Sequence, residues 1–328
     1  MRAFDVIIPF LSNRVDKAGG AILFGSHERV PLKKEAFQSL KPATGPRLVF
    51  VDSGSGRVLA GPSVCVDFVR LYSCWYEDNV RVDRELREFF LVVSAFQKGL
   101  DLGFEVVLFD LNGLEKEKFS FDAFDPVLCF GGRRAEPSAV VSYVRKLLEL
   151  RFVDELCNKL SKDDVIVRDG DLEARGDLME TVWHSLRVSS QRKGVVVLGL
   201  AKTSVLCTDS GNSALVALRK IAPSGSWFYY TGGSVGFVKL HPSSKYVFRC
   251  DVMPFDRDSL PKSWSALAAN AEDPAFLGYP YGLVDADKFA QVAKDELSQL
   301  RARFAVQSKE VFSSVESALD AHDLLNSF

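Results

Sequence analysis

Two apolar runs in this sequence each lead into an aspartate, and this repeated arrangement constrains the fold more than any other feature. Residues 164–170 read DVIVRDG, so that a β-branched run precedes Asp169. Residues 47–56 read RLVFVDSGSG, where a second apolar run ends at Asp52. Runs of this kind are typical of buried strands. A carboxylate at the C-terminal end of a central strand lies where α/β folds bind ligands, although Asp-Gly is also ordinary turn chemistry.

The order of the predicted elements indicates one mixed α/β domain. The first half predicts strands joined by short turns, as in an antiparallel meander, at 47–52, 57–60, 64–76, 88–96 (alternatively a helix) and 105–111. After Pro137, apolar residues recur at helical spacing as far as Leu160. The second half predicts a helix at 177–191, a strand at 195–200, a helical start at GLAKTS (199–204), strands at 226–231, 235–240 and 245–251, and a helical tail at 283–325. We expect residues 1–45, with a short helix within 31–40, to form an N-terminal arm, and residues 46–328 to form a single domain.

Composition excludes several classes of protein. Hydrophobic residues make up 47% of the 328 residues, which supports a sizeable core, and the formal net charge of -2 argues against a surface coated in basic charge. The six cysteines contain no CxxC pair, so that reduced thiols and a cytoplasmic location are expected. The sequence predicts neither a secretory signal nor a membrane span.

A third carboxylate lies on the helix between the two aspartate strands. Glu149 precedes Asp169 by twenty positions, and Glu155, on another face of the same helix, is the competing candidate. Carboxylates from two strands and a facing helix converge only if a cation or protons offset their mutual repulsion. Oxygen ligands suit hard divalent ions, and two such ions can activate water for phosphodiester hydrolysis. Each carboxylate taken alone is equally consistent with a solvated or turn residue.

Three cations are candidate contacts to nucleic acid. Lys202 follows an apolar strand and can meet a phosphate as a point charge, whereas Lys239 and Arg249 alternate with aromatic residues in GFVKLH and YVFRCD. An ordinary solvated surface explains all three equally well.

The motifs resemble the NurA nuclease family when they are taken together and in order. The matching strings are VFVDSGSG, RKLLELRFVDEL, VIVRDGDL, GLAKTS, VGFVKLHP with YVFRCD, and GYPYGLVDADKFA, which span roughly residues 47 to 290. The resemblance implies a ribonuclease H-like mixed sheet with flanking helices, with a β-hairpin and C-terminal helices added. It also implies that Asp52, Glu149 and Asp169 are metal ligands and that Tyr279 and Asp287 border the same catalytic site.

The resemblance further implies a function. NurA proteins are manganese-dependent, and Mg²⁺ is the alternative ion; they are single-stranded endonucleases and 5′–3′ exonucleases that act in end resection at DNA double-strand breaks. They form homodimers and work with the hexameric ATPase HerA. The sequence departs from the family at Ser53, where Gly is common, at Gly282, where Pro is frequent, and at Asp287, where some members carry His.

Two other functions remain open from the sequence. DSGSG and TGGSVG are compatible with the phosphate loops of an actin or sugar-kinase type ATPase, and a non-catalytic DNA-binding scaffold of the same fold is the other alternative. For contacts with partner proteins, the sequence offers two apolar segments. These are the N-terminal arm, with Val6, Ile7, Ile8, Phe10 and Leu11, and the tail, with Phe304, Val306, Val311, Phe312, Val315 and Leu319.

Overall fold

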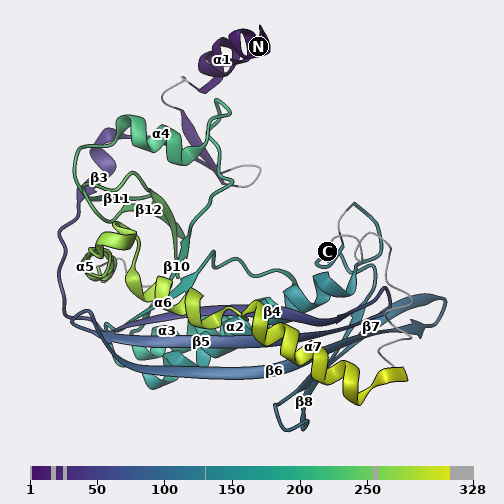
Figure 1. Cartoon of the computed structure of the whole chain (residues 1–328). Coiled ribbons are helices and arrows are strands. Elements are labelled where there is room, and N and C mark those ends of the chain that lie inside the picture. The colour runs from purple at the N-terminus through teal and green to yellow at the C-terminus, as the bar shows by residue number, and fades with distance from the viewer. Residues whose placement is uncertain (1, 16–19, 25–27, 130, 254–257, 311–328) are drawn as a thin grey trace.

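The computed structural model describes residues 2–15, 20–24, 28–129, 131–253 and 258–310 (Figure 1). The helices are α1 (Arg2–Val15), α2 (Pro137–Lys159), α3 (Gly176–Lys193), α4 (Ala214–Ile221), α5 (Leu260–Ala269), α6 (Tyr281–Ala290) and α7 (Lys294–Gln307), with the 3-10 turns η1 (Lys34–Ala36) and η2 (Pro274–Phe276). The strands are β1 (Ala21–Phe24), β2 (Glu28–Pro31), β3 (Phe37–Ser39), β4 (Leu48–Ala60), β5 (Val64–Glu77), β6 (Val80–Lys98), β7 (Asp101–Phe109), β8 (Glu115–Asp122), β9 (Val165–Asp169), β10 (Val196–Ala201), β11 (Trp227–Tyr230), β12 (Val235–Lys239) and β13 (Phe248–Val252).

Within the described residues, eleven strands form one sheet in the order β3-β11-β12-β13-β10-β9-β4-β5-β6-β7-β8. Strands β4 to β8 form the predicted antiparallel meander. β9 then joins the other side of β4, with β10 beside it, and both run parallel to β4 after the crossovers through α2 and α3. A first strand with a meander on one side and parallel strands on the other is the ribonuclease H-like arrangement, and the expected fold class is confirmed. The β11–β12 hairpin and the C-terminal helices are present as predicted.

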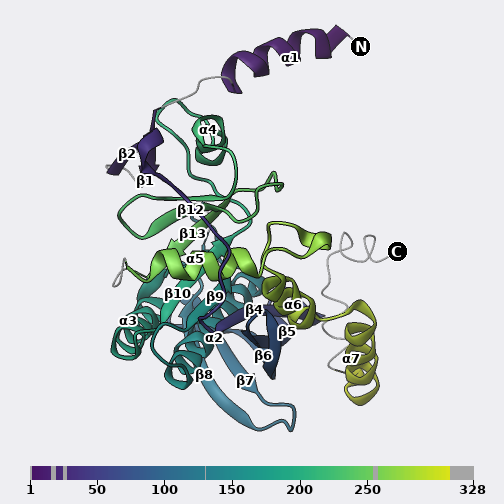
Figure 2. The ribbon, with the colours of Figure 1, turned by 90° about the vertical axis from the view of Figure 1, so that its left-hand side faces the viewer.

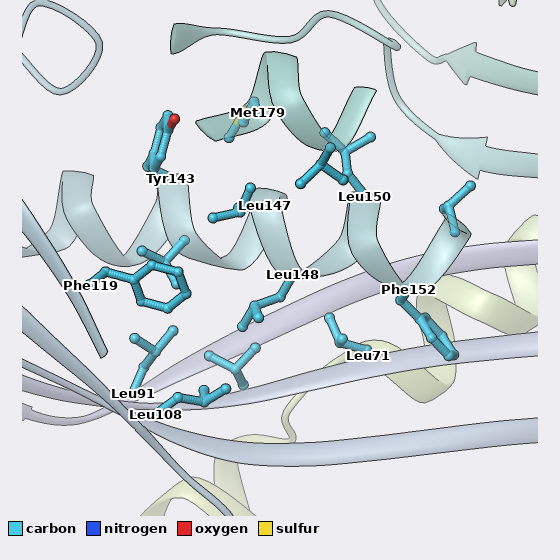
Figure 3. Close-up of a cluster of buried hydrophobic side chains, with 14 of the residues drawn as sticks. Leu71, Leu91, Leu108, Phe119, Tyr143, Leu147, Leu148, Leu150, Phe152 and Met179 are labelled. Carbon is cyan, nitrogen blue, oxygen red and sulfur yellow. The ribbon is translucent and has the colours of Figure 1, made fainter. Parts of the chain in front are cut away.

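The sheet separates two hydrophobic cores, with α2 and α3 covering one face and α6 the other (Figure 2). In Figure 3, α2 lies over the sheet, and Leu148 and Phe152 point from the helix toward the strands that carry Leu71, Leu91 and Leu108. Burial of one such side chain contributes about 1.5–3 kcal/mol. This packing fixes where α2 lies on the sheet.

Successive residues of the central strands alternate between the two cores. In β4, Val51 belongs to the core under α2 and Phe50 to the core under α6. In β9, Ile166 packs on the α2 side and Val167 on the α6 side. Because side chains along a strand point to opposite faces in turn, this alternation decides which face each polar residue at the strand ends occupies.

The predicted turn at SGSGR is wrong, because β4 continues through it as far as Ala60. Residues Ser53 to Gly56 pair with β5. A Cβ atom on Gly54 would lie 2.1 Å from the carbonyl oxygen of Ala290, at the end of α6. Glycine within a strand often marks such a close approach of another backbone. Gly54 therefore admits the end of α6 rather than ending the strand.

Three other local predictions change. GLAKTS does not start a helix, because β10 ends at Ala201 and the next helix, α4, begins at Ala214. The predicted helix within 31–40 reduces to the 3-10 turn η1 followed by β3. The helical alternative for 88–96 is wrong, since this segment lies in β6. The tail is helical in α6 and α7, and its predicted portion from 311 to 325 lies outside the described residues.

The N-terminal segment contacts the rest of the fold through β1 and β3, whereas α1 projects from it. β3 pairs with β11 at the sheet edge, and Ile22 of β1 packs in a cluster with Trp227. α1 projects away from the rest of the chain in both views (Figures 1 and 2) and exposes Val6 and Ile8. The division at residue 45 stays a prediction. Among the described residues, no helix is long and apolar enough to cross a membrane.

Candidate metal centre

Two neighbouring parallel strands bring Asp52 and Asp169 together. The β4–β9 register pairs Val51 with Arg168, which places the two aspartates side by side one residue later. By the alternation of the strands, Asp52 shares the face of Phe50, which is the face that α6 covers. The prediction that the two strands bring their aspartates together therefore agrees with the structure.

Helix α6 supplies the third carboxylate, Asp287. The helix packs against β4, β5 and β9. A Cβ atom on Gly282 would lie 2.0 Å from the Phe50 ring, so that this glycine lets the first turn of α6 rest directly on β4. Gly282 thus has a packing role. Because α6 lies this close to β4, Asp287, farther along the helix, lies over the ends of the strands.

Asp52, Asp169 and Asp287 form a carboxylate cluster in which one oxygen atom from each residue lies within 4.8 Å of the others. Burial, followed by the charges of Glu149 and Asp169, raises the pKa of Asp52 from 3.8 to about 7. Burial is also the largest cause that raises the pKa of Asp169, and the charge of Asp287 adds to it. Asp52 therefore retains a proton up to near neutral pH unless a cation replaces it.

Lys202 and Tyr279 border the carboxylate cluster. The ammonium group of Lys202 lies 2.7 Å from Asp169 Oδ2 and 3.9 Å from Asp287 Oδ1, and 5.4 Å from the centroid of the Tyr279 ring. Burial lowers the pKa of Lys202, but the bond to Asp169 and the surrounding carboxylates outweigh this and raise it. The Tyr279 hydroxyl is buried and makes no hydrogen bond of good geometry among the described residues, although burial and the nearby carboxylates, Asp169 foremost, raise its pKa. A buried hydroxyl in this position can turn to a ligand atom.

Glu149 lies on the other side of the sheet ends, with α2. It is 2% exposed and accepts hydrogen bonds from Arg168 Nε and Ser53 Oγ. Arg145, one turn earlier on α2, bonds to Ser53 as well. Ser53 follows Asp52 in β4, and Arg168 precedes Asp169 in β9. Because neighbouring residues of a strand point to opposite faces, Ser53 and Arg168 lie on the face of the sheet opposite to the aspartates. The charge of Glu149 reaches Asp52, but its carboxylate is held by a guanidinium group rather than grouped with the three aspartates.

The competing helical candidate, Glu155, points elsewhere. Its side chain is 54% exposed and forms an ion pair with Arg87 of β6. Arg168 is a residue that the sequence reasoning missed. The signal that would have found it is parity: in VIVRD the arginine falls on the alternate face from the aspartate and therefore toward α2.

The three predicted DNA-binding cations occupy different surroundings. Lys202 lies at the carboxylate cluster, and Lys239 lines a small groove together with Arg219 and Lys245. Arg249 is 9% exposed and its guanidinium binds both carboxylate oxygens of Asp251. A buried, paired guanidinium is a structural group, so that its predicted contact with DNA has no support from the geometry.

A cleft of about 680 Å³ opens beside the carboxylate cluster and shares Lys202, Tyr279 and Asp287 with it. Its remaining walls come from the segment before β13, including Tyr246, and from the segment around η2, including Phe276. The sequence reasoning did not single out these two aromatic residues. Tyr246 opens the motif YVFRCD, in which only Arg249 was given a role, and Phe276 lies in the 3-10 turn η2, where no periodic pattern marks it.

The donor set of the carboxylate cluster fits a divalent cation. All three candidate ligands are carboxylates, which are the ligands that Mg²⁺ and Mn²⁺ prefer. Burial, and after it the charges of Glu149 and Asp169, raises the pKa of Asp52, and a cation would offset both effects.

Comparison with known proteins shows similarity of structure rather than of sequence. No family model and no curated protein sequence matches the chain. The crystal structure of the NurA nuclease from Sulfolobus solfataricus matches with a TM-score of 0.54 and 11% identity, and 94% of each chain is covered. The catalytic domain of human endonuclease V gives a TM-score of 0.38 at 15% identity, covering 78% of this chain and 89% of that one. The first match shows that this chain has the fold of the NurA nuclease, which confirms the resemblance drawn from the motifs at the level of the fold.

Proposed function

We propose that this protein is a divalent-metal-dependent deoxyribonuclease that hydrolyses phosphodiester bonds. The observation that carries the proposal is the carboxylate cluster of Asp52, Asp169 and Asp287, located at the ends of the central strands of a NurA-like fold. Three carboxylates whose repulsion is relieved by a cation are the arrangement expected of a metal-assisted hydrolase.

In this proposal each residue has a defined task. Asp52, Asp169 and Asp287 would hold Mn²⁺ or Mg²⁺, and the ion would supply Lewis-acid stabilisation of charge on the phosphate and activation of water. Lys202 lies beside the cluster, where its ammonium group contacts Asp169. When the substrate binds, this ammonium group leaves Asp169 and binds a phosphate oxygen instead. Tyr279 offers its buried hydroxyl to the same phosphate or to a water molecule. Glu149 stays a predicted metal ligand, and its contacts with Arg168 and Ser53 support a role in holding the two aspartate strands in register.

The geometry favours this function over the ATPase alternative. Actin-type ATPases wrap phosphate in strand-to-strand loops whose backbone amides are free to donate. Here Ser53 to Gly56 lie inside β4 and pair with β5. The TGGSVG segment forms the β11–β12 turn, on strands separated from β9 by β13 and β10. The two glycine-rich segments therefore do not support a shared phosphate site.

The finer aspects of the function rest on the resemblance to NurA. We propose single-stranded endonuclease and 5′–3′ exonuclease activity, used in the cytoplasm for end resection at double-strand breaks. We also propose a homodimer that works with a HerA-type hexameric ATPase. The exposed apolar side chains of α1 support a protein partner, because a helix that projects from the fold leaves its apolar face uncovered.

One assay tests the central proposal. End-labelled single-stranded and duplex DNA is incubated with the protein and Mn²⁺ or Mg²⁺, with EDTA as a control. We expect cleavage that requires the ion and that disappears in Asp169→Asn, whereas Asp101→Asn, which changes an exposed carboxylate on β7, keeps full activity. DNA binding without any cleavage would favour the scaffold alternative instead.

A further inference from the structure

The cleft beside the carboxylate cluster is lined by a row of aromatic rings that leads from solvent to the carboxylates. Tyr246, at the outer end, is 50% exposed, and its ring centroid lies 6.3 Å from that of Phe248. Phe248 in turn lies 5.4 Å from Tyr279, whose ring is in contact with Lys202 at the cluster. Phe276, which is 48% exposed, lines the same cleft from the segment around η2. Half-exposed aromatic rings in a cleft are surfaces on which a planar ligand stacks.

Cations accompany the rings at both ends of the cleft. Lys202 lies at the inner end, at the cluster. Lys245 lies at the outer end, with its ammonium group 5.4 Å from the Tyr246 ring centroid, and it also lines the small groove that contains Lys239 and Arg219. A planar apolar site flanked by positive charges matches a nucleotide, in which a flat base is joined to phosphates on either side.

We propose that this cleft holds one unpaired nucleobase of the DNA strand whose phosphate lies at the carboxylate cluster. The inference rests on the proposed nuclease function and adds the reason for a preference for single strands. A base within a duplex has both faces covered by its neighbours, so that only a base that has left the stack can insert between protein rings. The volume of about 680 Å³ falls in the range of sites that enclose a small ligand and is ample for one nucleotide.

The proposal assigns separate tasks to the two parts of the site. The carboxylate cluster acts on the phosphate, and the cleft selects the conformation of the neighbouring nucleotide. A blunt duplex end must therefore unpair before it is cleaved. Stacking tolerates every base, because each base has a π face, and the cleft should consequently discriminate strand state rather than sequence.

The binding test uses no metal, so that it is independent of catalysis. In EDTA, fluorescence anisotropy measures the affinity of the whole protein for a labelled single-stranded oligonucleotide and for an abasic oligonucleotide of the same length. Because stacking on an aromatic ring is worth about 1–3 kcal/mol per base, the normal strand should bind about five- to 150-fold more tightly. Equal affinity of the wild-type protein for the two strands would overturn the proposal.

Substitutions locate the effect in the cleft. Tyr246→Leu and Phe276→Ala should each reduce the advantage of the normal strand over the abasic strand, and Tyr246→Phe should retain it. Phe124→Ala is the matched control, because Phe124 is also 50% exposed and lies outside the cleft. Melting temperatures check that the variants fold. If Tyr246→Leu and Phe276→Ala both keep the full advantage of the normal strand over the abasic strand, the assignment of the cleft is wrong.

A cleavage assay separates the failure of this inference from the failure of the proposed function. With Mn²⁺, the wild-type protein should cleave single strands faster than blunt duplexes, and the two cleft variants should show a smaller ratio. No cleavage of any DNA by the wild-type protein would overturn the nuclease function. Cleavage with an unchanged ratio in both variants would overturn only the base-binding cleft.

Discussion

Glu149 of α2 and Arg168 of β9 form a buried ion pair directly beneath the carboxylate cluster. The two residues are 2% and 5% exposed, and Arg168 Nε donates to Glu149. Arg168 precedes the cluster residue Asp169 in the chain, and Ser53, which also bonds to Glu149, follows Asp52. Glu149 therefore connects the two strands that carry the aspartates, from the face of the sheet opposite to them.

The first prediction is that Glu149→Gln destabilises the protein. Breaking a buried pair by removing the charge of one partner leaves the other uncompensated, which costs about 3–5 kcal/mol. Urea denaturation in EDTA should show this loss, and the double variant Glu149→Leu with Arg168→Met should recover much of it. A single variant as stable as the wild type would contradict the structural role.

The same Glu149→Gln variant also tests the role of Glu149 as a metal ligand. Residues that orient the ligands typically change metal affinity by about ten- to a hundredfold. A larger loss of Mn²⁺ affinity, measured by calorimetry, would support direct ligation.

The second prediction is that Asp52→Asn has the opposite effect on stability. The pKa of Asp52 is raised to about 7 in the folded protein, so that above this pH folding carries the full cost of an ionised Asp52. This cost lowers the free energy of unfolding by up to about 1.4 kcal/mol for each unit of the pKa shift. The metal-free variant should melt at a higher temperature than the wild type at pH 8, with a gain on the order of 2–4 kcal/mol. Cleavage should fall at least about a hundredfold, since charge stabilisation by a metal is worth several kcal/mol.

The control for the second prediction is Asp101→Asn, at an exposed carboxylate on β7, which should change neither quantity. Full activity of Asp52→Asn would remove Asp52 from the proposed site.

The sequence was sufficient to predict the meander, the helical crossovers and the meeting of Asp52 with Asp169, because these follow from apolar periodicity and from parallel pairing. For Asp287 the resemblance implied a place beside the catalytic site, where the structure finds it, but periodicity and spacing alone did not group it with the two strand aspartates. The role of Glu149 as a metal ligand stays a prediction. The parity of VIVRD indicates that Arg168 points toward α2, but its pairing with Glu149 also depends on how α2 packs on the sheet, which the tertiary structure decides. Asp287 joins the cluster only because Gly282 lets α6 rest on Phe50, and this contact has no local sequence signal beyond an isolated glycine.

The third prediction concerns pH and metal binding. A divalent ion must displace the proton from Asp52, whose pKa in the metal-free protein is about 7. Apparent Mn²⁺ affinity should therefore rise up to about tenfold per pH unit between roughly pH 5 and 7 and level off above. Calorimetry in buffers of different ionisation enthalpy should detect close to one proton released per site at pH 6. Affinity that is constant across this range would contradict the raised pKa.

Without metal, the pH dependence of stability has a defined sign. Between about pH 4 and 7 the folded protein retains a proton on Asp52 that the unfolded chain has lost. The contribution of Asp52 to the free energy of unfolding therefore falls as the pH rises through this window. The difference in melting temperature between Asp52→Asn and the wild type should widen over the same range and remain constant above it.

The fourth prediction concerns the DNA path. Lys202 and Lys245 lie along the cleft, so that Lys202→Ala and Lys245→Ala should each weaken binding to all sequences alike. Each should also lower the slope of log affinity against log salt by about one, because one fewer counterion is released. Lys118→Ala on β8, at the far edge of the sheet, is the control and should leave the slope unchanged.

Arg249→Met distinguishes the sequence-based prediction for Arg249 from its observed ion pair with Asp251. It should lower the melting temperature by leaving Asp251 unpaired and leave the salt slope unchanged. A reduced slope would restore Arg249 to the DNA path.

The last prediction concerns assembly. α1 exposes Val6 and Ile8 at 72% and 60% while projecting from the fold, which is costly in water unless a partner covers the helix. We expect light scattering to give twice the 36.4 kDa chain mass, because closed two-fold pairing is the commonest arrangement of identical chains. We also expect deletion of residues 1–20, or Val6→Asp alone, to abolish capture by a HerA-type ATPase while the nuclease activity persists. Leu100→Asp, in the exposed β6–β7 turn, controls for added charge, and Val306→Asp tests the tail as the alternative contact. A strictly monomeric particle at micromolar concentration would exclude the dimer, and capture that survives the deletion would exclude α1 as the docking element.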